Sequence, residues 1–391
     1  MTIAIVIIVI MFVLGRVFTT KQSPCQGHIS NKSEQIMKYG LQILHHSCIC
    51  VITVLFMGII ALASCSKDDD FQMPEEQTGV PRIILDVDIC SSTDDLFAMD
   101  MLYRYADQGR CRFLGIVVDR EGEGHSAFAD VMNTYFGYPN LPIGQVRNGI
   151  KDAKIWTDYR RVADLKDANG QAMFRRSITN YAELPDGYML YRRLLAGQPD
   201  KSVCIISIGF LTCLAQLLES GADEYSLLNG VDLVRRKVKC IYIMGGAFSQ
   251  TSESEYNFDQ GIGFSQTFFR LWPKDVDMMF SPGEVGDQVY YQPEQVISDI
   301  SWTDCHPIKQ VYLMKDYDDP GQRMWDPLTV IQAIEGDAAF LLSERGTVSI
   351  DSHAITTFTP SPSGNCRYQL PGDSAWAAAK LDYIRNMNKI H

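Results

Sequence analysis

Short apolar runs alternate along this chain with segments whose apolar residues recur every three or four positions. The apolar runs lie at 82–88, 112–118, 141–144, 203–208 and 238–244, with a further strand candidate at 346–350. Helical spacing is found at 94–107, 125–136, 211–219 and 374–388. Because apolar strands separated by helices are typical of parallel sheets covered on both faces, the pattern predicts an α/β domain with an open, mostly parallel sheet and helices on both faces. The polar stretch 150–185 has little periodicity and is expected to leave the core.

Four carboxylates crowd the end of the first apolar run. Asp86 and Asp88 end the run, and Asp94 and Asp95 begin the helical segment that follows it. Ligands of open parallel sheets bind beyond the carboxyl ends of the strands. We therefore expect these four side chains to face one crevice, together with the ends of the two central apolar runs.

Like charges at such spacing raise one another's pKa or require a cation. A hard divalent cation with oxygen ligands fits this set, and calcium suits flexible carboxylates and main-chain carbonyls better than magnesium. The alternative is that Asp94 or Asp95 only caps a helix, which needs one carboxylate and leaves Asp88 unexplained. The spacing therefore favours a metal or acid/base site.

Composition and charge narrow the classes of partner. With 391 residues, 46% of them hydrophobic and 21% charged, the chain has an ordinary globular composition. Its net charge of -12 and the absence of a basic stripe argue against nucleic acid as a partner. The eleven cysteines include no Cys-x-x-Cys pair, so those after residue 65 are expected to be small buried hydrophobes rather than zinc ligands.

The amino terminus carries the pattern of an export signal. The apolar run 3–14 is too short to span a bilayer as a helix. A second pattern starts at Met37, which we take as the start codon in use, with a basic start, an apolar stretch at 48–63 and the sequence LASC at 62–65. This ending resembles the lipobox of bacterial lipoproteins, in which Cys65 would be lipidated. A single transmembrane anchor is the alternative.

Either interpretation divides the chain at the same places and exports the remainder. We expect residues 1–65 to form the leader, 66–80 a polar linker and 81–391 the folded domain that carries the function. The acidic run 68–70 is similar to export signals of surface lipoproteins. We expect an exported lipoprotein anchored to the membrane through Cys65, at the outer membrane or facing the periplasm, with the cell surface as a further location.

Four segments resemble, in order, the motifs of the inosine-uridine-preferring nucleoside hydrolases. IILDVDICSSTDD is similar to the family's opening Asp-x-Asp-Pro-Gly-x-Asp-Asp, and SIGFLTCLAQLL (207–218) to its Thr-Gly-Pro-Leu-Thr-Asn segment. IMGGAF with EYNF (243–248 and 255–258) and MWDPLTV (324–330) match its Met-Gly-Gly, Glu-Phe-Asn and His-Asp-Pro-Leu segments. The resemblance covers about residues 82–390 and implies a nucleoside hydrolase-like fold with a Rossmann-like core.

The resemblance implies a calcium-dependent hydrolase of nucleosides or related ribosides, commonly a homo-oligomer. Asp88 would ligate Ca2+ and act as general base on the attacking water. Asp95 would be a bidentate ligand, and the main-chain carbonyl of Ile208 and the carboxylate of Asp326 would complete the metal site.

The sugar-binding residues follow from the same motifs. The resemblance implies that Asp94 holds a ribose hydroxyl, that Asp326 touches the 3'-hydroxyl, and that Glu255 and Asn257 bind the ribose around its 5'-hydroxyl. Cleavage of an N-glycosidic bond builds positive charge on the sugar ring, which nearby carboxylates stabilise.

Two features depart from the family pattern. The first motif is two residues longer between Asp88 and Asp94, with ICSST in place of Pro-Gly; serine and threonine are expected to make that turn and cap the helix. Trp325 stands where many members have the His that protonates the leaving base, and an indole cannot act as an acid near pH 7. Trp325 is open to two interpretations, stacking on a planar aglycone or packing. The mature histidines, apart from the terminal one, are His125, His306 and His353, and structural or surface roles are expected for them.

Two rival functions stay open at this point. A haloacid-dehalogenase-type phosphatase also has DVD after a strand, with Asp318 and Asp319 as late magnesium ligands, but it leaves the EYNF and WDPL segments unexplained. A non-catalytic lipoprotein that binds a sugar or riboside through calcium is motivated by the missing acid at Trp325.

Overall fold

The computed structural model describes residues 79–249, 253–314, 317 and 321–389. The strands are β1 (Arg82–Val87), β2 (Arg112–Val118), β3 (Ile143–Gln145), β4 (Val203–Ser207), β5 (Val238–Met244), β6 (Asp277–Ser281), β7 (Tyr290–Tyr291), β8 (Gln322–Arg323), β9 (Leu341–Leu342), β10 (Gly346–Ile350), β11 (Thr356–Pro360) and β12 (Cys366–Leu370). The α-helices are α3 (Asp94–Asp107), α4 (Glu123–Tyr135), α5 (Gly187–Ala196), α6 (Thr212–Glu219), α7 (Gly230–Lys237), α8 (Tyr256–Asp259), α9 (Ile262–Leu271), α10 (Gly283–Gly286), α11 (Pro293–Asp299), α12 (Pro307–Tyr312), α13 (Trp325–Glu335) and α14 (Ser374–Asn388). Short 3-10 turns occupy Arg160–Asp164, Tyr181–Glu183 and Asp337–Ala339.

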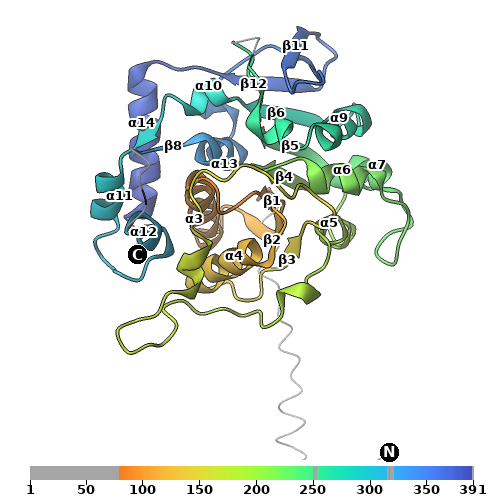
Figure 1. The fold of residues 1–391 in the computed structure, drawn as a ribbon. Coiled ribbons are helices and arrows are strands. Elements are labelled where there is room, and N and C mark those ends of the chain that lie inside the picture. Colours follow the sequence, from red (N-terminus) through yellow and green to blue (C-terminus); the bar gives the residue numbers. More distant parts are fainter. Residues whose placement is uncertain (1–78, 250–252, 315–316, 318–320, 390–391) are drawn as a thin grey trace, which may run out of the picture. The chain divides into compact units, whose positions relative to one another are not determined.

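One sheet organises these elements (Figure 1). Its strand order is β11-β10-β12-β6-β5-β4-β1-β2-β3, with β9 paired to β12. The run from β12 through β6 to β3 is parallel, whereas β10 pairs antiparallel with both β11 and β12. From β1 the chain adds β2 and β3 on one side and later β4, β5 and β6 on the other, so the strand order reverses between β1 and β4. Such a reversal opens a crevice at the carboxyl ends of the strands.

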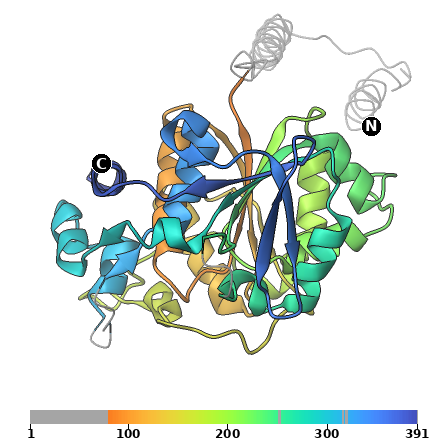
Figure 2. The same ribbon diagram turned by 90° about the horizontal axis from the view of Figure 1, so that it is seen from above.

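Helices cover both faces of the sheet, as the view from above shows (Figure 2). The core on one face combines residues of β1 with α3, α4, α13 and α14. The core on the other face is built from α5, α6, α7 and α9. Strands β1 and β4 are buried throughout because both faces of the sheet are covered, which favours apolar residues at most of their positions.

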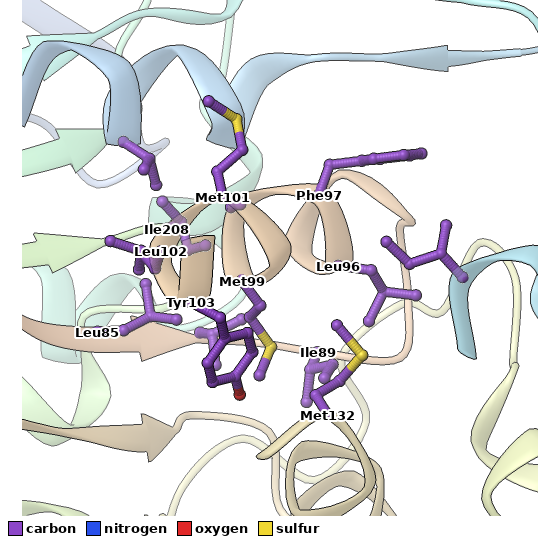
Figure 3. Packing of buried hydrophobic residues seen from close by; sticks show 14 of the residues in the cluster. Leu85, Ile89, Leu96, Phe97, Met99, Met101, Leu102, Tyr103, Met132 and Ile208 are labelled. Atoms are coloured by element: carbon purple, nitrogen blue, oxygen red, sulfur yellow. The ribbon is translucent and has the colours of Figure 1, made fainter. Parts of the chain in front are cut away.

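Helix α3 is buried along most of its length, because α13, α14 and β2 pack against it. Figure 3 shows its apolar residues packing among Leu85 of β1, Met132 of α4, and Ile89 and Ile208, which follow the ends of β1 and β4. A helix surrounded in this way is fixed in position. Its first turn therefore holds Asp94 and Asp95 rigidly at the edge of the sheet.

The predicted α/β architecture is confirmed. Predicted and observed bounds agree for β2, β5, β10, α3 and α14, and the stretch 150–185 contains only two short 3-10 turns. The sequence did not predict strands β6, β9, β11 and β12, helices α5, α7, α9 and α13, or several short elements, although β10 at the antiparallel edge was predicted. Of the cysteines in the described residues, Cys305 is exposed and the others are buried, as expected for small hydrophobes.

The predictions for the leader and linker fall on residues 1–78, outside the described part of the chain. Residues Thr78–His391 form one compact unit. Among the described residues, none of the helices has the length and apolar character needed to cross a membrane.

Candidate active site at the carboxyl edge of the sheet

A cavity of about 470 Å³ lies at the carboxyl ends of β1, β4 and β5. It is bordered by the first turns of α3 and α13 and by the segment around α8. Eight of the residues singled out from the sequence line it: Asp88, Asp94, Asp95, Ile208, Glu255, Asn257, Trp325 and Asp326. The fold therefore brings together side chains that are more than 200 positions apart in the sequence.

Three carboxylates converge in this cavity. Asp94, Asp95 and Asp326 each offer an oxygen within 4.8 Å of those of the other two. All three lie in the first turn of a helix, Asp94 and Asp95 in α3 and Asp326 in α13. The amide N–H groups at a helix amino terminus favour negative charge, so two helix ends partly offset the repulsion within this carboxylate triad.

Neighbouring groups fix Asp94 within the triad. One of its oxygens accepts hydrogen bonds from the Ser92 hydroxyl and, at 3.2 Å, from Gln322 Nε2. The other oxygen lies 3.4 Å from the backbone N–H of Asp326. Asp94 is therefore held between α3, β8 and α13, with its orientation set before any ligand binds.

Burial and mutual repulsion raise the pKa values of the three carboxylates in the triad. Burial raises the pKa of Asp94 to about 7, against hydrogen bonds from Ser92 and the Asp326 backbone that lower it. Burial, then the charges of Asp88 and Asp94, raise the pKa of Asp95 well above its usual range. Burial, then Asp94 and Asp95, do the same for Asp326. Such a group of carboxylates holds protons or a cation.

The triad fits a divalent cation. Asp95 is 1% exposed, and its Oδ1 atom has no hydrogen-bond partner among the described residues. A buried carboxylate oxygen without a donor is costly unless something positive lies against it. Hard oxygen ligands suit calcium or magnesium rather than a softer metal. The donor set present is therefore the one that a hard divalent cation requires.

Asp88 lies beside the triad but has a different partner. Its Oδ2 atom accepts a hydrogen bond of 2.7 Å from Nη2 of Arg120, a buried residue that follows β2. Burial raises the pKa of Asp88, while the charge and hydrogen bond of Arg120 lower it. Among the described residues, Asp88 does not belong to the group of carboxylates that meet within 4.8 Å.

Glu255 and Asn257 form the opposite wall. The Glu255 side chain caps the short helix α8 by accepting from the backbone N–H of Asn257 at 3.3 Å. Burial raises the pKa of Glu255 to about 7. The Asn257 amide donates to the carbonyl oxygens of Ile208 at 3.4 Å and Met244 at 3.3 Å. The Ile208 carbonyl therefore borders the cavity, where the resemblance places a ligand.

The extended turn after Asp88 is built differently from the expectation. Cys90 has a φ of 78°, a left-handed conformation that non-glycine residues adopt rarely. The hydroxyl of Tyr159 accepts from the Cys90 N–H at 2.9 Å and donates to the Ser92 carbonyl at 2.8 Å. The expected cap of α3 is not formed, because the Thr93 side chain makes no capping bond and instead contacts Tyr312 and Gln322. A tyrosine from the 150–185 segment thus stabilises the turn.

Trp325 supplies no acid to the cavity. Its Nε1–H lies 3.2 Å from both the Gly283 carbonyl and Asp287 Oδ1. None of the histidines within the described residues lines the cavity. His125 and His306 are buried elsewhere, where burial lowers their pKa values to about 4 and about 3, and His353 is exposed. Structural and surface positions of the histidines agree with the expectation.

The expectation that Asp86 faces the crevice is wrong. Asp86 does not line the cavity and is fully buried below it, where it accepts a hydrogen bond of 2.7 Å from the Tyr191 hydroxyl. Burial, and then the neighbouring Asp119, raise its pKa well above the usual range. Asp86 still belongs to β1, whose side chains are covered on both faces, whereas Asp88 lies beyond the strand end.

Three residues of the site were missed by sequence reasoning. Arg120 follows β2 as Asp88 follows β1, so the rule of strand ends would have found it. Gln322 precedes the last motif by a few positions and bonds to Asp94. Trp156 lies in the irregular segment and lines the cavity with its side chain 60% exposed; no periodicity marks it. An exposed indole at a cavity rim is a surface on which a planar group can stack.

Comparisons with known proteins bear on the fold of the chain. No protein-family model matches the sequence, and no curated protein matches it. The inosine-uridine preferring nucleoside hydrolase from Bacillus anthracis superposes with a TM-score of 0.59 at 15% identity, over 79% of this chain and 99% of that one. The purine-preferring ribonucleoside hydrolase from Gardnerella vaginalis gives 0.57 at 16%, over 79% and 100%.

A third structure carries a related ligand. The type III effector protein XopQ, complexed with adenosine diphosphate ribose, superposes with a TM-score of 0.54 at 16% identity, over 80% of this chain and 94% of that one. Likeness at such identities is a statement about fold, and it agrees with the motifs read from the sequence. This chain has the fold of the nucleoside hydrolases in a divergent form.

Proposed function

We propose that this protein hydrolyses the N-glycosidic bond of a nucleoside or a related riboside, assisted by a divalent cation, Ca2+. The observation that carries the proposal is the buried carboxylate triad of Asp94, Asp95 and Asp326 in a cavity of about 470 Å³. The cavity lies at the carboxyl edge of a sheet with the nucleoside hydrolase fold. Its size suits a small molecule that is largely enclosed.

The cation would be held by the carboxylates of the triad and the Ile208 carbonyl. When bound, Ca2+ would lower the pKa of a coordinated water and fix the orientation of a sugar diol. We propose calcium rather than magnesium because the ligands come from separate elements, namely two helix ends and one strand end. Magnesium demands a more regular octahedral set and keeps more of its waters.

Asp88 is the residue proposed to accept the proton of the attacking water. A general base must be ionised, and Arg120 favours the ionised form against the effect of burial. Its Oδ2 atom is bound by Arg120, so the proposal assigns proton uptake to the other oxygen.

Sugar recognition is proposed for the acidic and amide groups around the cavity. Asp94 and Asp326 would accept hydrogen bonds from the ribose diol, and Glu255 with Asn257 would bind the 5' end. Several carboxylates around a neutral sugar become more favourable as the ring develops positive charge. The same groups therefore bind the substrate and lower the barrier.

Protonation of the leaving group is the step for which this cavity offers no histidine among the described residues. Trp325 can pack or stack but cannot transfer a proton near pH 7, and its N–H is already engaged by Gly283 and Asp287. We propose substrates whose aglycone leaves without protonation, or with weak assistance. Trp156 and Trp325 both line the cavity and are proposed to contact a planar aglycone.

We also propose that the protein is exported and anchored to a membrane by a lipid on Cys65, and that it forms homo-oligomers. These proposals rest on the leader pattern and the family resemblance. Mass spectrometry of the membrane fraction tests the lipid, and light scattering of the detergent-free protein tests the oligomer.

The decisive assay is sugar release from a panel of nucleosides and activated ribosides, in calcium and in chelator. We expect calcium-dependent release that Asp88→Ala and Asp326→Asn abolish. Asp382→Asn, an exposed carboxylate on α14, is the matched control and should retain full activity. Release that persists in chelator or in Asp88→Ala would contradict the proposal.

The missing acid favours a second candidate, a calcium-dependent protein that binds sugars or ribosides without cleaving them. Calorimetry on the same panel separates the two. Calcium-dependent binding of a riboside with no release of sugar, even from activated ribosides, would favour the binding protein.

A further inference from the structure

Arg120 is a buried cation at the edge of the proposed metal site, with all its nitrogens engaged. Its Nη2 atom donates to Asp88 Oδ2 at 2.7 Å and to the Tyr256 hydroxyl at 3.1 Å. Its Nε atom donates to the Asp88 carbonyl oxygen at 3.0 Å. Its Nη1 atom lies 3.3 Å from the carbonyl oxygens of Ala153 and Lys154. The residue is only 3% exposed, so these bonds replace its hydration.

Among the described residues, Asp88 is the only charged group to which Arg120 donates hydrogen bonds. Its guanidinium lies over the ring of Phe210, 5.0 Å from the centroid, and its other hydrogen-bond partners are neutral oxygens. A buried charge is strongly destabilising when its counter-ion is removed. Asp88 could leave Arg120 only by exposing this uncompensated charge to a nonpolar environment.

The triad is complete without Asp88. Oxygens of Asp94, Asp95 and Asp326 meet within 4.8 Å, and among the described residues no such group of three includes Asp88. Asp95 Oδ1, a buried oxygen with no hydrogen-bond partner among the described residues, also belongs to the triad. Asp88 and Arg120 thus form an ion pair beside the triad, and the charges of both act on the neighbouring Asp95.

We propose that Arg120 is a built-in counter-cation that holds Asp88 outside the inner ligand set of the divalent cation. The triad then supplies all the carboxylates that bind the metal directly. Arg120 acts through Asp88 and is therefore a positioning residue: it fixes the carboxylate that faces the attacking water. The inference rests on the proposed function, because it assumes a divalent cation at the triad, and it departs from the resemblance, which makes Asp88 a metal ligand.

The chemistry and the contacts of the Arg120 side chain agree with this role. Arg120 is planar, always charged and able to bind a carboxylate and a carbonyl through separate N–H groups. It also bonds to the carbonyl oxygens of the segment that carries Trp156. A single side chain therefore links the orientation of Asp88 to the wall of the cavity.

The test counts the water molecules on a bound lanthanide ion, used as a spectroscopic substitute for calcium. Luminescence lifetimes of Tb3+ in H2O and D2O are measured with wild type, Asp88→Asn, Arg120→Gln and the double variant. We expect Asp88→Asn to have the same number of coordinated waters as wild type. Arg120→Gln should lose about one water, because the released Asp88 carboxylate enters the ligand set, and Asp88→Asn in that background should restore it.

Asp95→Asn is the positive control, since removing a ligand of the triad should add water or abolish binding. Asp88→Asn in the wild-type background decides the question even if Arg120→Gln fails to fold, and circular dichroism verifies the fold of each variant. A gain of coordinated water in Asp88→Asn would overturn the proposal, as would absence of Tb3+ binding to wild type.

Sugar release by the same proteins separates this inference from the proposed function. If wild type releases sugar in a calcium-dependent manner and Asp88→Asn gains a bound water, only the role of Arg120 is wrong. If wild type binds Tb3+ through the triad with Asp88 outside, the inference stands even where no riboside is cleaved.

Discussion

Removing one carboxylate from the triad should stabilise the protein when no cation is bound. For two unit charges 4.8 Å apart, the repulsion is roughly 3 kcal/mol at an effective dielectric constant of about 20. Asp95 has two such neighbours, Asp94 and Asp326. Protonation relieves part of this repulsion, since burial raises the pKa of Asp94 to about 7 and raises those of Asp95 and Asp326 well above their usual range. We expect Asp95→Asn to raise the free energy of unfolding in chelator by about 2 kcal/mol near pH 8.

The sign of the pH dependence follows from the raised pKa values. Between the usual value of 3.8 and the raised pKa of Asp95, the folded protein binds more protons than the unfolded chain. The stability of cation-free wild type therefore falls as the pH rises through this window. Asp95→Asn lacks this contribution, so its advantage over wild type should grow from pH 5 to pH 8.

Calcium should reverse the order of the two proteins. A cation at about 100 times its dissociation constant stabilises the folded state by about 2.7 kcal/mol, and only wild type retains the complete triad. Urea unfolding followed by tryptophan fluorescence, in chelator and in calcium at pH 5 and pH 8, measures all four conditions, with Asp382→Asn as control. Lower stability of Asp95→Asn in chelator at pH 8, or equal stabilisation of both proteins by calcium, would refute the reasoning.

Three further predictions test the surroundings of the site. Gln322→Ala should weaken cation binding about 10- to 100-fold, because it frees Asp94 from one of its donors; calorimetry with calcium measures this, and unchanged affinity would contradict it. Trp156→Ala should raise KM about 5- to 100-fold for ribosides with a planar aglycone and leave kcat nearly unchanged, an effect that should be absent for ribosides with a small aliphatic aglycone. His125 is held neutral by burial, with its pKa lowered to about 4. Its contribution to the free energy of unfolding is therefore complete above pH 6.5 and falls by about 3 kcal/mol as the pH falls to 4. Urea unfolding of His125→Asn should show a smaller loss of this free energy at acid pH than wild type.

The order of the elements and the position of the cavity were predictable from the sequence. Continuous apolar runs predicted the parallel strands β1 to β5 and several of the helices between them, because burial on both faces leaves such a run, whereas β6 and β12 were missed. The rule of strand ends then located the carboxylates, since parallel strands bring their carboxyl ends to one edge. Asp326 needed the family motif as well, because nothing in its local spacing relates it to Asp94 more than 200 positions earlier.

The same rule of strand ends would have placed Arg120 at this edge, but it would not have predicted the contact between its side chain and Asp88. Strand periodicity predicts which edge a residue reaches but not which neighbour its side chain meets, and Asp88 and Arg120 are related only through the pairing of β1 with β2. Whether a carboxylate binds a metal or an arginine depends on that one contact. Asp86 was misplaced for the same reason. It lies two positions before Asp88, within the buried strand, and accepts a hydrogen bond from Tyr191 below the cavity.

The irregular segment 150–185 explains how the departures from the family pattern fit together. Its Tyr159 hydroxyl holds the turn at Cys90 and Ser92 that replaces the Pro-Gly of the family motif. Its carbonyl oxygens at residues 153 and 154 bind Arg120, which binds Asp88. The lengthened turn, the arginine and the segment therefore depend on one another through single hydrogen bonds, which leave no periodic trace in the sequence. A change in any one of them should be felt at Asp88, so the chemistry of this site is set as much by the segment outside the core as by the strands within it.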